Sequence, residues 1–474
     1  MRATFSGFEA ARSGLTAAQA GLDVTANNIA NLSTQGYSRQ IVDQSATYTA
    51  STADRLANAM PYANGVGVTV DGISQARSSF LDLRFRDSTS EDSVNQKTLS
   101  VLTDIESIFD ETQTDGLSTT LEDFYTQLQT LSLNAGEVEY SSMARSGAQK
   151  VTQMLNQYAA QLSTVYDQTA EEMNLNVDDA NTLLEKINTV NQSMRVAVLQ
   201  KSSTNELNDT RNQYLDKLSS YMNIEVQAHD DGSISVLSGG VSLLDAATNT
   251  ISTLGTDDST GDMRLLAGGT ELTLTGGSFM GSMRMLNGRG SYASAGQSDF
   301  RGIPYYQAAL DSFASELGDT FNDLNGAGKP LFSGSTAEDI EISDEWLADP
   351  NQITASTQTN PTKGMNDNIL RMISALDESR AISPSFTGSF GEFLVSTMGE
   401  VAVDTEYTRD ISETSDMVLT TVSNDRESVM GVSLNEETVN LLKYQKAFAA
   451  SARVMTALDE ALDTIINGMG TVGR

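Results

Sequence analysis

Residues 26–40 read ANNIANLSTQGYSRQ and end a predicted N-terminal helix. Asparagine side chains bond to backbone groups where a helix unwinds, and Gly36 permits the positive φ of a tight turn. An ordinary helix end explains the glycine, but it does not explain three asparagines interleaved with the apolar residues of a packing stripe. We therefore take the segment as a candidate functional motif that includes Asn27, Asn28, Asn31 and Gly36.

Two apolar stripes with a period of about 3.5 residues lie at opposite ends of the chain and predict two amphipathic helices. The N-terminal stripe consists of Phe8, Ala11, Leu15, Ala18, Leu22, Ile29 and Leu32, with Thr25 as its one polar position. The C-terminal stripe consists of Leu441, Tyr444, Phe448, Met455, Leu458, Leu462 and Ile465, with Ser451 as its one polar position, and Leu434 precedes it. Such stripes suit packing against each other or against neighbouring copies. Pattern alone favours two core helices of one domain, because core stripes far outnumber assembly stripes.

Charge separates the two ends of the chain from its middle. The 474 residues carry a formal net charge of -34. Residues 1–60 hold four basic and four acidic side chains, and residues 431–474 hold four basic and five acidic ones. A chain this acidic repels phosphate backbones and anionic lipids, which argues against nucleic acid as a partner. The nearly uncharged ends are expected to lie in a different environment from the acidic middle.

Residue usage leaves little room for catalysis or metal binding. The chain has no cysteine, which excludes disulfides and thiolate metal sites, and its one histidine, His229, lies in a predicted turn. We predict no enzyme activity, no cofactor and no metal. No segment has the run of about 18 apolar residues that a spanning helix needs, and the N-terminus lacks the apolar core of a signal peptide. We expect no membrane insertion, and any export must use no cleavable signal.

Proline placement and periodicity organise the rest of the chain. Residues 62–303 and 385–474 contain no proline, which permits long helices. Near residue 223 the period changes to alternation around Asp230-Asp231-Gly232, and Gly268-Gly269 separates two further short strands. The predicted fold is mostly α with a β-rich insertion, an elongated and discontinuous α+β chain. Its predicted parts are a terminal helical module (1–60 and 431–474), a helical bundle (61–222, 300–326 and 365–430) and a β-rich outer domain (223–299 and 327–364).

The segment ANNIANLSTQGY closely resembles the signature shared by axial proteins of the bacterial flagellum, the rod, hook and hook-associated proteins. The resemblance implies that the signature residues of this chain are Asn27, Asn28, Asn31, Thr34, Gly36, Tyr37, Ser38, Arg39 and Gln40. The residues that follow it, Ser38-Arg39-Gln40, and the C-terminal segment GVSLNEETVNLLKYQKAFAASARVMTALDEALDTII resemble the hook-associated members found at the junction of hook and filament. Two internal blocks, TNELNDTRNQYLDKLS and GIPYYQAALDSFASELGDTFNDLNGAG, are similar to blocks of the same family in the same order.

The resemblance implies a mechanical function and a set of partners. In this family the terminal helices pair as a coiled coil and stack with neighbouring subunits to line a tube. The chain would form an extracellular adaptor layer at the hook-filament junction. It would contact the hook protein, the next hook-associated protein and other copies of itself in a ring-like layer. Family members leave the cell through the flagellar type III apparatus, and a cytoplasmic chaperone would cover the C-terminal stripe before export.

Three other functions stay open at this point. One is a hook or distal-rod axial protein, which the Ser38-Arg39-Gln40 and SLNEE segments disfavour. Another is a secreted carbohydrate-active or carbohydrate-binding protein that uses the β-rich insert. An apolar cleft with converging carboxylates in residues 223–364 would favour this second function. A signalling coiled coil ranks last, because the sequence has no membrane span or catalytic motif.

Overall fold

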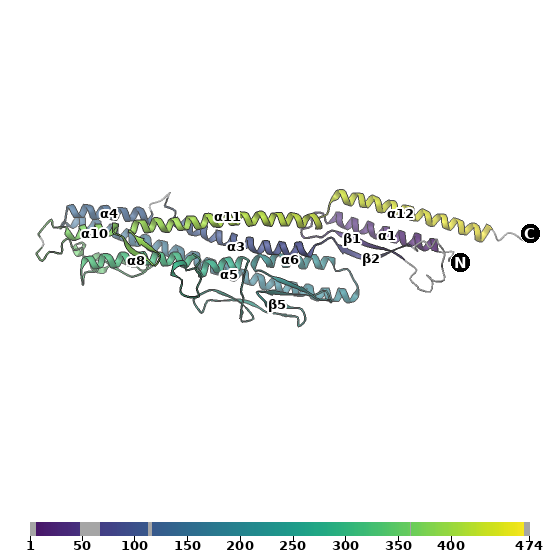
Figure 1. Ribbon diagram of the computed structural model, residues 1–474, viewed down its shortest axis with the longest axis horizontal. Coiled ribbons are helices and arrows are strands. Elements are labelled where there is room, and N and C mark those ends of the chain that lie inside the picture. The colour runs from purple at the N-terminus through teal and green to yellow at the C-terminus, as the bar shows by residue number, and fades with distance from the viewer. Residues whose placement is uncertain (1–5, 48–66, 112–115, 361, 469–474) are drawn as a thin grey trace, which may run out of the picture.

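The computed structural model describes residues 6–47, 67–111, 116–360 and 362–468. The molecule is a long rod with a thin helix pair at one end and a thicker helical bundle along the rest (Figure 1). Small antiparallel sheets lie beside the helices. The predicted fold class, mostly α with a β insertion, is confirmed.

The thin end consists of helices α1 (Ser6–Ala30) and α12 (Leu434–Asp463), which lie side by side, and α12 runs on into a π turn (Thr464–Gly468). Ser433 caps α12 by accepting a hydrogen bond from the backbone N–H of Glu436. Two antiparallel strands, β1 (Gln40–Ala46) and β2 (Val68–Gln75), pack beside α1 with Val42 opposite Ile73. The sequence analysis did not predict this strand pair, whose strands lie in residues assigned to the terminal helical module (1–60) and to the helical bundle (from 61).

The bundle is built from long helices that the proline-free stretches permit. Its helices are α3 (Ser79–Phe109), α4 (Leu117–Leu133), α5 (Val138–Gln200), α6 (Asn205–Tyr221), α8 (Ile303–Asn325), α10 (Asp367–Asp377) and α11 (Phe390–Met430). Helix α5 has 63 residues and is therefore about 95 Å long. Helix α11 lies along α3, and Ser389 with Glu392 forms a capping box at its start. Pro304 occupies the first turn of α8, where no intrahelical N–H is needed.

Aromatic rings fill the bundle core where α8 meets its neighbours. Phe321 on α8 lies 5.3 Å from Phe124 on α4, and Phe313 lies 5.3 Å from Phe390 at the start of α11, measured between ring centroids. All four side chains are fully buried. Such contacts join helices from distant parts of the chain into one core.

Two small sheets cover one side of α5. The first contains β3 (Glu225–Ala228), β4 (Ile234–Ser238), β5 (Val241–Asp245) and β6 (Thr250–Ile251); the second contains β7 (Leu254–Asp257), β8 (Arg264–Ala267) and β9 (Thr270–Glu271). The hairpin turns at Gly232 and at Gly268-Gly269, where φ is positive, confirm the two predicted hairpins. Side chains of α5 anchor both sheets: Asn191 donates to the Ile234 carbonyl (2.8 Å), and Asn181 donates to the Leu254 carbonyl (3.0 Å).

Other parts of the predicted β-rich domain differ from the expectation. Residues 223–299 also contain α7 (Ser278–Asn287) and the 3-10 turn η1 (Gly290–Tyr292). Residues 327–364 hold only a short ladder of β10 (Phe332–Ser333) and β11 (Glu341–Ile342), with α9 (Asp344–Ala348) and η2 (Pro350–Gln352). The ladder belongs to neither of the two sheets on α5. A hairpin of β12 (Arg380–Ser383) and β13 (Phe386–Gly388) interrupts the predicted helical segment 365–430. The division into three domains stays a prediction.

Candidate functional site: the helix pair and its joint to the bundle

Helices α1 and α12 pack antiparallel at close range. Three α1 glycines spaced by seven residues face three α12 residues with the same spacing: Gly7 with Leu458, Gly14 with Ser451, and Gly21 with Tyr444. A Cβ atom at Gly21 would lie 2.5 Å from the Tyr444 ring, so the glycine is required for this approach. Contacts that recur every seven residues along both helices are typical of a coiled coil in a single register. The sequence analysis missed these glycines, although their spacing was visible.

The predicted apolar stripes lie on the paired faces, with an offset on α1. On α12, Leu441, Tyr444, Phe448, Met455, Leu458 and Leu462 are half-buried, whereas Leu434 at its start and Ile465 in the π turn after it are about half exposed. On α1, Ala11 and Ala18 are buried, and Phe8, Leu15, Leu22 and Ile29 are half-buried. Two details are corrected. Leu32 lies beyond the end of α1 and is exposed, and Thr25, expected to break the stripe, is only 2% exposed.

Asparagines of the motif fold the chain from α1 into β1. Asn28 is buried, and its amide pairs with the Gln40 backbone in both directions: Nδ2 donates to the carbonyl (2.9 Å) and Oδ1 accepts from the N–H (2.9 Å). Tyr37 Oη donates to Asn28 Oδ1 (2.8 Å), and Asn27 Nδ2 donates to Tyr37 Oη (3.3 Å). Burial and the nearby charges of Asp209, Glu206 and Glu437 raise the pKa of Tyr37 to about 12.

The remaining motif residues complete the same turn. Asn31 Nδ2 donates to the backbone carbonyl and to Oδ1 of Asn27 (both 3.0 Å), and Thr34 Oγ1 donates to Asn31 Oδ1 (3.1 Å). Gly36 has φ +75, as the turn was predicted to require. The side chain of Gln40 is within 3.4 Å of Glu206. The asparagines of the motif therefore hold the turn between α1 and β1 through hydrogen bonds to the backbone of the same chain.

Arg39 joins β1 to the last helix. Its Nε lies 2.8 Å from Glu437 Oε1, its Nη1 lies 2.8 Å from Glu436 Oε2, and its backbone N–H donates to the carbonyl of Met430 at the end of α11. The Glu437 side chain is only 2% exposed. The segments Ser38-Arg39-Gln40 and SLNEE, which the sequence analysis singled out, thus contact each other although they lie near opposite ends of the sequence.

Helix α6 supplies the opposite wall of this region. The Ser38 N–H and Oγ both donate to Asp209 (3.1 and 2.7 Å), and Gln75 Nε2 donates to the same carboxylate (2.8 Å). Asn205 Nδ2 donates to the carbonyl of Ile73 on β2 (3.1 Å). Burial raises the pKa of Asp209, and the hydrogen bonds from Ser38 oppose that shift. Polar residues of the block TNELNDTRNQY therefore hold the strand pair.

A buried ion network continues from this wall into the bundle. Three arginines alternate with three aspartates of α3 and α6 through the pairs Arg77–Asp209 (3.4 Å), Arg77–Asp82 (2.6 Å), Arg426–Asp82 (2.9 Å), Arg426–Asp216 (2.6 Å) and Arg86–Asp216 (2.8 Å). These side chains are 9% to 17% exposed, so their desolvation is offset by mutual pairing and by hydrogen bonds such as those of Ser38 to Asp209 and of Arg86 to Asn212. We call residues 35–40, 73–86, 205–216, 426 and 430–437 the joint.

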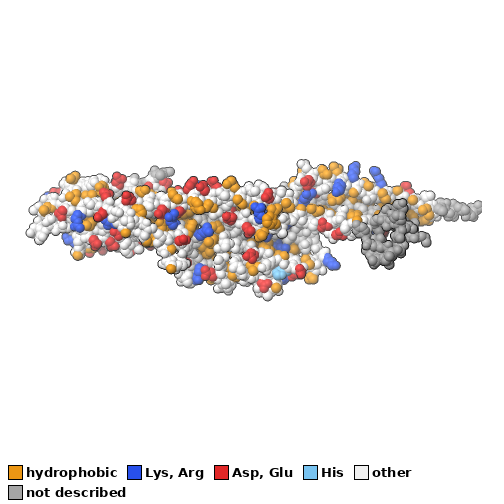
Figure 2. Space-filling view, viewed as in Figure 1, with side chains coloured by type: hydrophobic (Ala, Val, Ile, Leu, Met, Phe, Trp, Pro, Cys, Tyr) orange, Lys and Arg blue, Asp and Glu red, His pale blue; other side chains and the backbone are white. Residues whose placement is uncertain are grey.

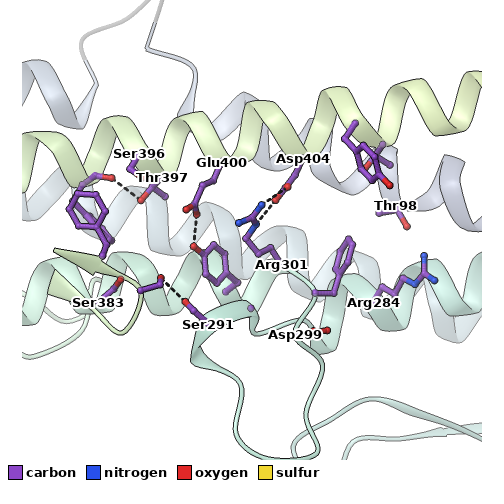
Figure 3. A pocket seen from close by; sticks show the side chains of 18 of the residues that line it. Thr98, Arg284, Ser291, Asp299, Arg301, Ser383, Ser396, Thr397, Glu400 and Asp404 are labelled. Carbon is purple, nitrogen blue, oxygen red and sulfur yellow. Dashed lines mark hydrogen bonds and ion pairs between the residues drawn. The ribbon is translucent and has the colours of Figure 1, made fainter. Parts of the chain in front are cut away.

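A separate cavity of about 500 Å³ lies farther along the bundle between α11, η1 and the β12–β13 hairpin (Figure 3). Three carboxylates line it, Asp299 and the α11 residues Glu400 and Asp404, and the two on α11 are already engaged. Asp404 holds Arg301 through two bonds (2.6 and 2.7 Å), and Glu400 accepts a hydrogen bond from Tyr305 Oη. Because Glu400 and Asp404 are paired and lie on α11, residues 223–364 supply only Asp299 to this cavity, and not the converging carboxylates expected of a carbohydrate-active insert.

The described ranges offer neither a cluster of metal ligands nor a helix suited to a membrane. In that part of the chain, no group of three His, Asp or Glu side chains is placed to hold a metal ion. His229 Nε2 lies 2.8 Å from Ser235 Oγ across the β3–β4 hairpin. Over the same residues, no helix combines the length and apolar character needed to cross a bilayer.

Three family models match the chain, and each matches a different part of the structure. The model "Flagellar hook-associated protein FlgK helical domain" matches residues 102–340, about half of the chain. The model "Flagella basal body rod protein" matches residues 8–37, which cover most of α1 and the asparagine motif. The model "Flagellar basal body rod FlgEFG protein C-terminal" matches residues 427–468, which cover α12.

Curated relatives are similar along the whole chain. Flagellar hook-associated protein 1 of Bacillus subtilis is 28% identical over 509 aligned positions, covering 100% of both chains. The protein of the same name from Escherichia coli is 24% identical, covering 96% of this chain and 98% of its own. Among solved structures, the flagellar hook junction protein FlgK from Burkholderia pseudomallei matches with 21% identity and a TM-score of 0.45, over 53% of this chain and 46% of that one.

Proposed function

We infer the function from family membership, because this chain belongs to the flagellar hook-associated proteins of the FlgK helical-domain family. We propose that it is a structural subunit of the junction between the flagellar hook and filament. The observation that carries this proposal is the similarity to hook-associated protein 1 across the full length of both chains.

The joint supports a mechanical role. The helix pair contacts the bundle through strands, hydrogen bonds and buried ion pairs that come from α3, α6, α11 and α12. Breaking one partner of a buried pair is costly, so the joint resists separation of the two parts. A force applied to the helix pair is therefore transmitted to the bundle instead of being absorbed by a flexible linker.

The partners of this subunit follow from its place in the layer. We propose that it binds the hook protein on one side and the next hook-associated protein on the other. We propose further that copies associate through the helix pair into a ring-like layer, with the two apolar stripes and the α12 ends Leu434 and Ile465 at the assembly surface. The near-zero charge of both chain ends supports close packing of copies there.

Export precedes assembly, and we propose that it uses the type III route without a cleavable signal, so that the protein acts outside the cell. Before α1 pairs with it, α12 exposes Leu441, Phe448, Met455 and Leu462. An unpaired amphipathic helix of this kind needs cover, and a cytoplasmic export chaperone would supply it.

Complementation tests the function directly. In cells of the source organism that lack their own copy, flagellin is expected in the medium instead of in attached filaments. The full-length chain should restore attached filaments and swimming, and a chain ending at Ser433 should not. A matched control, Leu133→Ser at a position that is 84% exposed on the bundle, should restore both. Filaments attached in cells that contain only the shortened chain would refute the proposal.

A further inference from the structure

Arg211 on α6 is a buried cation whose hydrogen-bond partners are all neutral. Its side chain is only 8% exposed. In the described part of the chain it donates to the carbonyl of Gly232 (2.7 Å), to Oδ1 of Asn208 (2.9 Å) and to Oδ1 of Asn191 (3.5 Å). Burial and the positive charges of two other arginines of the joint lower the pKa of Arg211 to about 10. Keeping this charge buried therefore depends on the neutral acceptors around it.

The terminal nitrogens of Arg211 bind two different parts of the molecule. Nη1 donates to the Gly232 carbonyl in the turn of the β3–β4 hairpin. Nη2 donates to Asn208, whose Nδ2 donates in turn to Oε1 of Gln75 (2.9 Å), the last residue of β2. A continuous chain of hydrogen bonds thus runs from the hairpin turn through α6 to the strand pair.

The hairpin at the far end of this chain lies at the surface. Figure 1 shows the first sheet, labelled at β5, along the edge of the rod opposite α11. His229 and Asp231 are exposed, and Figure 2 shows the pale-blue side chain of the histidine at the surface. Asp231 shapes the turn, because it accepts from the N–H and Oγ of Ser233 and pairs with Arg195 (2.9 Å). A contact on this hairpin therefore acts on the turn that Arg211 binds.

The second sheet has no comparable link. Asn181 of α5 holds β7 by donating to the carbonyl of Leu254 (3.0 Å) and accepting from its N–H (2.8 Å). Over the described ranges, no hydrogen bond joins β7, β8 or β9 to the joint. The two sheets therefore differ in whether they reach the strand pair.

We propose that Arg211 couples the first sheet to the joint, so that the β3–β4 hairpin and the strand pair open together. When the hairpin opens, the guanidinium loses the Gly232 carbonyl and turns toward water, which also breaks its bond to Asn208. A contact that holds the hairpin closed then stabilises the joint, and one that opens the hairpin loosens it. Arg211 is a positioning residue in this coupling, and the inference concerns the single chain, beyond the proposed function.

Hydrogen exchange of the purified full-length chain tests the coupling. Asp231→Ala removes the hydrogen bonds of the turn without touching Arg211, and it should speed exchange of hairpin amides (225–238) about tenfold. Exchange of the strand pair (40–46 and 68–75) should rise with it by about threefold or more. Asn181→Ala is the matched change in the second sheet, and it should speed exchange in β7 and β8 but not in the strand pair.

Breaking the chain of hydrogen bonds should remove the coupling. In a background of Arg211→Met or of Asn208→Ala, Asp231→Ala should still speed exchange of the hairpin. It should change exchange of the strand pair by less than about 1.5-fold relative to that background. Lys217→Met, at an exposed position of the same helix, is the control background and should keep the coupling. Asn208→Ala keeps the buried charge, so it decides the test if Arg211→Met does not fold.

Two results would overturn the coupling. In one, Asp231→Ala leaves exchange of the strand pair unchanged in the natural chain. In the other, the strand pair responds equally in the natural chain and in the backgrounds with a broken link. Either result comes from the isolated chain and leaves the junction function standing, because that function is tested by filament attachment in cells.

Discussion

Single residues set the distance and the register of the helix pair. Gly21 differs from other glycines of the chain because an aromatic ring occupies the space where its Cβ would be. Gly399 on α11 has the same helical setting, but no atom lies within 4 Å of a Cβ built there. Comparing the two positions therefore distinguishes a steric requirement for glycine from the effect of helix propensity.

Alanine at these glycines should act in opposite directions. Gly21→Ala should weaken the helix pair by about 1–3 kcal/mol, because the added methyl group overpacks the Tyr444 contact. Gly399→Ala should stabilise α11 by up to about 1 kcal/mol through its higher helix propensity. Hydrogen exchange of α1, α12 and α11 amides in the full-length chain measures both changes. Unchanged protection of α1 and α12 in Gly21→Ala would mean that the helices are not in close contact.

Arg39 should contribute more to the stability of the helix pair than its position in a turn suggests. In Arg39→Met, Glu437 is left buried without its partner, and opening of the first α12 turn should become easier by about 1–3 kcal/mol. The control is Arg12→Met, which removes an exposed ion pair with Glu9 and should change stability by less than about 0.5 kcal/mol. Local hydrogen exchange at residues 434–440 distinguishes the two, and equal effects would show that the Arg39 pair is not structural.

At the scale of the elements, α6 connects several segments of the joint. Its first half holds β2 and Ser38, and its second half binds Arg86 and Arg426 through Asp216. The sequence predicted this helix from its apolar residues, and the resemblance singled out its polar ones. Their role depends on side chains from four other segments, which no local pattern could identify.

Titration of Asp209 on α6 should give a pH signature. Its pKa is raised in the folded chain, so between the unfolded value of about 3.9 and the folded value the folded state binds more protons. This carboxylate therefore adds stability as pH falls through that window and loses it as pH rises. Relative to Asp209→Asn, which does not titrate, the natural chain should gain stability when pH is lowered from 7 toward 4. Urea unfolding of both chains at several pH values measures the difference, and parallel pH profiles would contradict the assigned burial effect.

The sequence predicted helices correctly wherever the apolar residues recur with a helical period over a long segment, as in α5, α8 and α12. The strand pair β1–β2 was not predicted, because Gln40 and Gln75 are held by α1 and α6 instead of by an alternating apolar face. The α1 stripe was placed slightly off because small residues, Ala17 and Gly21, form the actual contact and carry little apolar signal. Among candidate site residues, the asparagine motif was found, but its action on the Gln40 backbone could not be inferred from spacing.

At the scale of the whole molecule, the helix pair, the joint and the bundle form one continuous rod (Figure 1). The interior of the joint is charged, whereas the interior of the bundle is aromatic and aliphatic. The joint therefore depends on the geometry of its ion pairs, and the bundle depends on apolar burial. High salt should leave both largely unchanged, because these ion pairs are buried, but it should weaken contacts between the exposed charges of neighbouring copies.

The pairing of the first helix with the last has a consequence for synthesis. A span of 398 residues separates Arg39 from Glu437, so this contact has one of the highest sequence separations that the fold allows. Loop closure over such a span is slow and cannot occur until the final helix has been made. A prematurely terminated chain can fold much of its bundle but never completes the paired end. Only a chain that includes the last helix can therefore form the paired end, and incomplete chains lack the feature by which copies would join.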